Sequence, residues 1–144
     1  MNELEEKTWK ILARPQTAAL ATISETGVPW VRYVTIESDS DFTLRFCTSI
    51  SSRKARQMTD NASVHLTCGN LQPPADSAFL QIVGNAKISA DSATKVKFWQ
   101  EGWKRYFKGP DDPDYVMVFI HPIRIEYNGP GSFVPEVWKE KIRS

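Results

Sequence analysis

The strand-like segments of this chain are apolar on both faces, and this double pattern limits the folds that the chain can adopt. In the segment 42–48, Phe42, Leu44 and Phe46 share one side and Cys47 lies on the other. The segment 115–127 repeats the pattern, with Val116, Val118 and Ile120 against Met117 and Phe119. One apolar face can fill a closed barrel, but the other must be covered by a helix or a partner chain. The sequence therefore predicts a small barrel that forms a dimer, although covering helices alone would also satisfy the pattern.

Turn residues divide the chain into segments that predict a mainly β fold, a β-barrel with flanking helices. Strands are expected over residues 17–24, 28–37, 42–48, 62–68, 78–89 and 115–127. A helix is expected in the N-terminal segment 1–14, beginning at residue 3, and further helices over 52–59 and 91–108. Short turns join the first three strands, which is typical of an antiparallel meander. Gly84 is expected to mark a bulge, and Pro122 to bend or break the last strand.

The length predicts a single domain, 1–144, that is large enough to bury a core. Residues 69–77 are expected to form a loop, and residues 129–144 a C-terminal tail with a short amphipathic piece. The apolar residues of that piece are Val137, Trp138 and Ile142. Helix 91–108 is expected to pack an aromatic face on the barrel, made of Val96, Trp99, Trp103 and Tyr106 or Phe107. Trp30 is assigned to the core.

The charge balance argues against a polyanionic partner. Eighteen basic residues against seventeen acidic ones give a net charge of +1, so no global field attracts nucleic acid or an anionic membrane. No apolar run approaches the roughly 20 residues that a membrane helix needs. The first six residues are acidic and lack a signal-peptide core. We therefore expect a cytoplasmic protein without a nucleic-acid or membrane partner.

The metal-binding residue types are scattered along the sequence. Cys47 and Cys68 do not form a Cys-x-x-Cys pair, and we interpret both as small buried hydrophobic residues. His65 and His121 lack the spacing to other ligands that a metal site requires. The aspartates of segment 111–114 lack the bidentate Glu of a calcium loop, so they are interpreted as a plain connection. No metal site is predicted.

The start of helix 52–59 breaks a local rule. Arg53 and Lys54 lie in its first turn, where the helix dipole is positive and favours anions over cations. The hydroxyl of Ser52, the free N–H groups of the first turn and the two cations together suit a phosphate group. The alternative is a solvated helix start whose long cationic side chains point away from the protein.

Arg32 is a second unusual cation, because it shares a strand face with apolar Val34 and Ile36. A charge on an apolar face needs a partner. One interpretation is that the carboxylate of Glu37 pairs with it inside the protein. The other is that Arg32 reaches the barrel rim and meets a polar ligand. In that case Arg32, Thr48, Arg53 and Lys54 would converge on one phosphate-bearing molecule.

Several segments together resemble a known family. They are Gly27-Val28-Pro29 with Arg32-Tyr33-Val34, Phe46-Cys47-Thr48, Ser52-Arg53-Lys54-Ala55, Met58-Thr59-Asp60-Asn61, Ile82-Val83-Gly84, the run from Trp103 to Asp114, and the run from Pro122 to Tyr127. Their order and spacing resemble the FMN-binding split barrels of the pyridoxamine 5′-phosphate oxidase-like family, in its bacterial general stress protein branch. The resemblance covers roughly residues 5–128.

This resemblance implies a six-stranded antiparallel split β-barrel that forms a homodimer with FMN bound at the subunit interface. Arg32 and Lys54 would bind the FMN phosphate, helped by Ser52 and Arg53. The isoalloxazine and ribityl chain would be lined by the backbone of Arg32, Tyr33, Val34 and Thr35, together with Cys47 and Thr48. Polar groups around the ring set the electronics of a flavin.

The sequence departs from the true oxidases of that family. Asn128 stands where they carry a Trp, no Arg-rich substrate motif follows it, and Phe79 replaces a Gln. We therefore expect an FMN-dependent oxidoreductase that acts on an unknown small molecule other than pyridoxamine phosphate. A non-catalytic flavin-binding stress protein, acting as carrier or sensor, is the alternative. A barrel that binds haem or a deazaflavin is another. No catalytic acid or base can be assigned.

Overall fold

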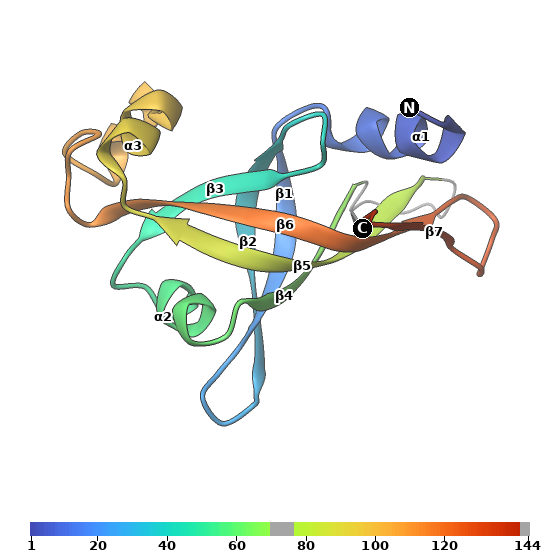
Figure 1. Ribbon diagram of the computed structural model, residues 1–144, viewed down its shortest axis with the longest axis horizontal. Helices are drawn as coiled ribbons and strands as arrows, with labels where there is room; N and C mark the ends of the chain where they lie inside the picture. The colour runs from blue at the N-terminus through green and yellow to red at the C-terminus, as the bar shows by residue number, and fades with distance from the viewer. Residues whose placement is uncertain (70–76, 142–144) are drawn as a thin grey trace.

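A computed structural model describes residues 1–69 and 77–141, and Figure 1 shows their arrangement. The strands are β1 (Gln16–Ile23), β2 (Pro29–Ser38), β3 (Leu44–Ser49), β4 (Ser63–Gly69), β5 (Phe79–Ser89), β6 (Tyr115–Asn128) and β7 (Glu136–Lys139). Most of the loop predicted at 69–77, and Ile142 of the predicted tail piece, lie outside the described residues. The predicted strands are all present, with ends that differ by at most two residues from the expected ones.

The strands form a closed antiparallel barrel in the order β3-β2-β1-β4-β5-β6, and pairing of β3 with β6 closes it. The closure is uneven. Strand β3 pairs with β2 only through Glu37↔Arg45 and Ser38↔Leu44, whereas its pairing with β6 runs from Leu44↔Ile120 to Ser49↔Tyr115. Beyond these short contacts β2 and β3 separate, which leaves backbone and side chains of both strands accessible to a ligand. The predicted split barrel is confirmed.

Inward-facing residues of the strands fill the barrel. The fully buried ones include Leu20, Ile36, Leu44, Leu66, Leu80, Ile82, Ile120 and Ile125. Trp30 is not among them, because 45% of its surface is exposed, so its assignment to the core was wrong. Cys68 is a buried free thiol and Cys47 a half-buried one. Within residues 1–69 and 77–141 no group of three His, Cys, Asp or Glu side chains could hold a metal ion.

The N-terminal helix and the helix after β3 both begin with a side-chain cap. Helix α1 (Glu3–Leu12) starts at Asn2, whose side chain accepts from the backbone of Glu5 while the Glu5 side chain accepts from that of Asn2. Helix α2 (Arg53–Asp60) starts at Ser52, whose hydroxyl accepts from the backbone N–H of Ala55. In the described part of the chain no helix is both long enough and apolar enough to span a membrane.

The prediction of one helix over 91–108 was wrong. The segment forms α3 (Ser92–Phe98) and a 3₁₀ helix, η1 (Glu101–Arg105), separated by extended backbone at Trp99 and Gln100. This break lets both indole rings reach the same residue, because Trp99 and Trp103 lie 5.4 and 5.7 Å from the ring of Tyr115. Val96 is 63% exposed and does not belong to that face.

Pro122 was expected either to bend or to break the last strand. Strand β6 runs through Pro122 without a break. The ladder accommodates the proline by an extra residue on β6 itself, because Val83 pairs with Arg124 and Gly84 with Pro122, which leaves Ile123 without a partner in this register. The register of β5 against β6 shifts between Val83 and Gly84, and Gly84 then pairs with Pro122. A proline cannot donate to the ladder, so an irregularity beside it is the usual solution. The bulge predicted at Gly84 is confirmed.

The amphipathic tail piece proves to be strand β7, which adds to the edge of β6. Its Trp138 packs edge-on against Phe42, with ring centroids 5.5 Å apart. An ion pair between Lys7 and Glu136 joins α1 to β7. Figure 1 shows α1 and β7 at this side of the molecule, with α3 at the opposite end. The tail therefore closes the end of the barrel away from α3.

Candidate functional site

The cationic start of α2 lies beside a cavity. The side chain of Lys54 is half-buried and lines it, whereas the guanidinium of Arg53 stacks 4.5 Å from the ring centre of Trp30. Burial lowers the pKa of Lys54, and the charge of Arg32 lowers it further. No carboxylate in the described ranges forms an ion pair with either cation. The solvated alternative therefore does not hold for Lys54.

Arg32 is held by neutral groups. Its Nη1 donates to the Oγ1 of Thr22 at 2.7 Å, and to the backbone oxygens of Trp30 at 2.8 Å and Leu20 at 3.2 Å. Burial lowers the pKa of Arg32, and the charge of Arg53 adds to this effect. The interpretation that Glu37 neutralises Arg32 was wrong, because the strand register places Glu37 opposite Arg45 and the two form an ion pair.

The cavity has a volume of about 770 Å³, within the size range of small-molecule sites. Its barrel side is lined by residues that the sequence predicts, namely Tyr33, Val34, Thr35, Cys47, Thr48, Ser52 and Lys54. Arg32 and Arg53 do not line it, but they stand next to Lys54 at the start of α2. The cavity thus has a cationic end with hydroxyls from Thr48 and Ser52, whose oxygens lie 3.2 Å apart.

The opposite wall of the cavity was not predicted from the sequence. It is built by the α3–η1 segment and by residues around the start of β6, namely Phe98, Gln100, Trp103, Arg105, Tyr106, Phe107, Asp114 and Met117. The aromatic spacing of segment 99–107 gave a signal, but we interpreted it as packing alone. Phe107 and Trp103 both pack on buried Tyr115 and face the cavity, so one aromatic cluster supports the wall and provides its surface.

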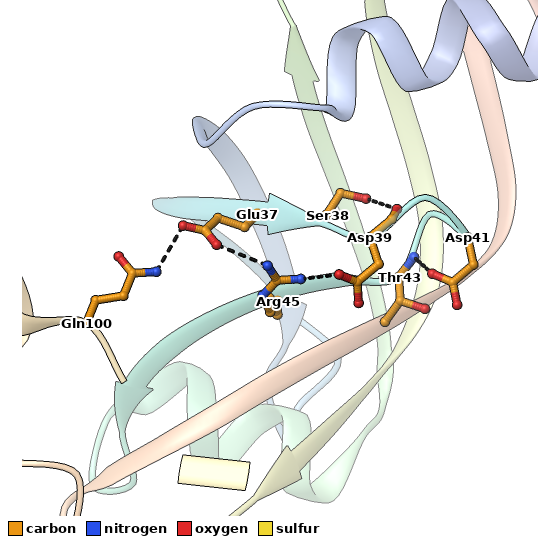
Figure 2. Close-up of polar contacts among 7 residues, drawn as sticks. All are labelled: Glu37, Ser38, Asp39, Asp41, Thr43, Arg45 and Gln100. Atoms are coloured by element: carbon orange, nitrogen blue, oxygen red, sulfur yellow. Dashed lines mark hydrogen bonds and ion pairs between the residues drawn. The ribbon is translucent and has the colours of Figure 1, made fainter. Parts of the chain in front are cut away.

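The far end of the cavity carries a charge that is already neutralised. Figure 2 shows Arg45 between two carboxylates, with its Nη1 2.6 Å from Asp39 and its Nη2 3.1 Å from Glu37. Gln100 donates to the second oxygen of Glu37 at 2.9 Å and so ties the α3–η1 segment to β2. Because Arg45 is paired, its charge is not available to an anionic ligand. Lys54 at the start of α2 and Arg105 of η1 are the lining cations that form no ion pair with a residue of the ranges 1–69 and 77–141.

The cysteine that lines the cavity offers little acid–base chemistry. Burial raises the pKa of the Cys47 thiol to about 11, so this thiol stays protonated at neutral pH and is a poor nucleophile. The same cause raises the pKa of Cys68 to about 12. What the site provides is an aromatic wall, backbone groups of β2 and β3, and a cationic end. These features suit a flat molecule with an anionic tail.

Comparisons with known proteins agree with the motif-based resemblance. The sequence profile of a family described as pyridoxamine 5′-phosphate oxidase matches residues 4–129. General stress protein 26 of Bacillus subtilis (strain 168) is 30% identical over 133 residues, 92% of this chain and 94% of that protein. The crystal structure of General Stress Protein 26 from Bacillus anthracis str. Sterne has 29% identity and a TM-score of 0.80, covering 96% of this chain and 100% of that one. A putative pyridoxamine 5′-phosphate oxidase from Listeria innocua has 31% identity and a TM-score of 0.75, covering 87% and 98%.

Two further solved structures share the barrel. An F420 reductase has 25% identity and a TM-score of 0.64, covering 81% of this chain and 94% of that one. A heme binding protein from Mycobacterium smegmatis has 18% identity and a TM-score of 0.76, covering 96% and 59%. The latter likeness shows the fold alone. The barrel by itself therefore does not select the cofactor, and the selection must come from the side chains around the cavity.

Proposed function

The chain belongs to the pyridoxamine 5′-phosphate oxidase family, and we propose that its cavity binds FMN and that the protein is a flavin-dependent oxidoreductase acting on a small molecule. The observation that carries this proposal is the group of cations without carboxylate partners at one end of an aromatic-walled cavity. Arg32 and Lys54 are half-buried, and a charge partly withdrawn from water favours an ionic partner, so we expect an anionic ligand to complete this group.

Each part of FMN finds matching residues. Lys54 and Arg32 would bind the phosphate, with Ser52 and Thr48 donating hydroxyl hydrogen bonds and Arg53 adding charge. The backbone of Tyr33, Val34 and Thr35, with Cys47, would line the ring system and the ribityl chain. When bound, the flavin supplies the redox chemistry, and the protein supplies orientation and a polar environment. The protein then contributes mainly by holding the two reactants in position.

A non-catalytic role as a flavin carrier or sensor is the second candidate. It is favoured by the Cys47 thiol, which lines the cavity but stays protonated at neutral pH because its pKa is about 11. Haem is less well supported. His65 and His121 are both exposed strand residues, and neither lines the cavity.

The absorbance spectrum of the purified protein, recorded with and without added FMN, tests the proposal. We expect flavin bands, quenched flavin fluorescence and one flavin per chain. No binding at micromolar FMN would overturn the proposed cofactor, and a Soret band would favour haem instead. To separate enzyme from carrier, the bound flavin is reduced anaerobically and mixed with candidate acceptors. Reoxidation by one class of small molecule and not by others supports turnover.

We also propose that the protein is a homodimer with the flavin site at the interface. Strands β1 and β2 extend beyond the barrel as a hairpin (Figure 1), and β2 exposes large apolar side chains. The exposed fractions are 45% for Trp30, 68% for Val31 and 73% for Tyr33, and Val28 just before the strand is 47% exposed. Val31 and Tyr33 share one face of β2 and Trp30 lies on the other, because successive strand residues point to opposite faces. Large exposed apolar side chains gathered on one strand are typical of an interface. Because Tyr33 also lines the cavity, a partner bound to this strand would lie next to the flavin.

Val31→Glu is expected to convert the dimer to a monomer, because a charge would then be buried without a partner at the interface. Light scattering coupled to size-exclusion chromatography measures the mass directly. Phe133→Glu is the matched control, since Phe133 is fully exposed outside β2. A dimer that survives Val31→Glu but dissociates with Phe133→Glu would place the interface on the C-terminal segment instead.

A further inference from the structure

Arg32 belongs to a buried polar cluster that the proposed ligand contacts do not explain. Thr22 on β1 is fully buried and Gln57 on α2 is 9% exposed. The Oγ1 of Thr22 donates to the Oε1 of Gln57 at 2.5 Å and accepts from the Nη1 of Arg32 at 2.7 Å. The same Gln57 oxygen lies 3.5 Å from the Nη2 of Arg32. The three side chains, from β1, β2 and α2, therefore form a closed ring of contacts.

This ring fixes the guanidinium without neutralising it. All acceptors around Arg32 are neutral: a hydroxyl, an amide oxygen and two backbone oxygens. Among the described residues, the Nε–H of Arg32 has no acceptor, so donors remain for a ligand. The barrel also holds Arg45 in the opposite way, between the carboxylates of Glu37 and Asp39. Arg45 is therefore a structural arginine whose charge is paired, whereas the charge of Arg32 stays available to a ligand.

We propose that Gln57, with Thr22, is a positioning residue for Arg32, and that its neutral amide preserves the positive charge that selects a phosphate-bearing flavin. The inference rests on the proposed function, since it assigns Arg32 to the FMN phosphate. Gln57 lies four residues after Arg53 on α2. The start of α2 contributes Ser52 and Lys54 to the cavity. Through Gln57, the same helix also holds Arg32, the third residue of the proposed phosphate site.

Gln57→Glu tests the charge at nearly constant volume. A carboxylate at this position would pair with the guanidinium and repel an incoming phosphate, as Glu37 and Asp39 pair with Arg45. We expect FMN affinity to fall about tenfold to a hundredfold, which corresponds to the loss of one or two charge-assisted hydrogen bonds. Affinity for riboflavin, which lacks the phosphate, should change less than about threefold. The matched control is Gln81→Glu, which adds the same charge on β5 at a half-buried glutamine bonded to Asn128.

Thr22→Val and Thr22→Ser provide a second test that does not depend on folding of the Gln57 variant. Val removes the hydroxyl that bridges Gln57 and Arg32, while Ser retains it. We expect the preference for FMN over riboflavin to fall in Thr22→Val and to be restored in Thr22→Ser. Thermal unfolding of each apoprotein identifies variants that do not fold, so that only folded ones are titrated.

The outcomes separate this inference from the proposed function. If the parent protein binds FMN and prefers it to riboflavin, but Gln57→Glu keeps that preference, the positioning role is wrong and the flavin site stands. Equal loss of FMN and riboflavin in Gln57→Glu would also overturn it, because a merely structural defect acts on both ligands. If the parent binds no FMN, the proposed function fails and the inference fails with it.

Discussion

Replacing Arg32 and Lys54 together by alanine is expected to weaken FMN binding by about 3–6 kcal/mol, because each replacement removes a charge-assisted hydrogen bond to phosphate worth about 1.5–3 kcal/mol. The two cations are close enough for the charge of Arg32 to lower the pKa of Lys54, and no carboxylate within residues 1–69 and 77–141 pairs with either. A phosphate relieves this repulsion when it binds. The affinities of parent and variant are measured by titration of flavin fluorescence.

Two comparisons make this result specific. Riboflavin affinity should be nearly equal in the parent and the double variant, since the contacts proposed for the two cations are with the phosphate alone. The control replaces Arg56 and Lys87 by alanine, which removes the same net charge at two exposed positions of α2 and β5. We expect the control to bind FMN as the parent does. A double variant that retains parental FMN affinity would show that the phosphate lies elsewhere in the cavity.

The cationic end of the cavity was predictable from the sequence because its signal is local. Cations in the first turn of a helix violate a dipole preference that depends only on neighbouring residues, and the N-cap role of Ser52 follows from the same turn. The apolar alternation that predicts the barrel is local in the same sense. The residues alone left open whether Arg32 and Lys54 bind the same ligand. The family resemblance implies that both bind the phosphate of FMN.

The other parts of the site depend on long-range geometry that a sequence pattern does not contain. Whether Glu37 pairs with Arg32 or with Arg45 is decided by the register between β2 and β3, which sets Glu37 opposite Arg45. The second wall of the cavity exists because extended backbone at Trp99 and Gln100 interrupts the helical pattern. Packing of both indole rings on Tyr115 overrides helix propensity there, and nothing local predicts that packing.

Gly84 lies where β5 and β6 leave no room for a side chain. It lies at the register shift of β5 and pairs with Pro122 of β6. A Cβ atom built on Gly84 would come within 2.7 Å of the backbone oxygen of His121 and 2.9 Å of the Cγ2 of Ile120. The first contact is with backbone in the middle of the sheet, so it cannot be relieved by a side-chain rotation. The glycine is required because two strands approach each other closely across a proline.

Gly84→Ala is therefore expected to lower the free energy of unfolding by about 2–4 kcal/mol, the cost of forcing strands apart in a packed core. Urea denaturation followed by circular dichroism measures the change for the apoprotein. Gly102→Ala is the matched control, because a Cβ at Gly102 meets no atom within 4 Å and should leave stability within about 0.5 kcal/mol of the parent. Equal stability of the two variants would mean that β5 and β6 can separate at the bulge without loss. The barrel would then not depend on close contact between Gly84 and β6 at this point.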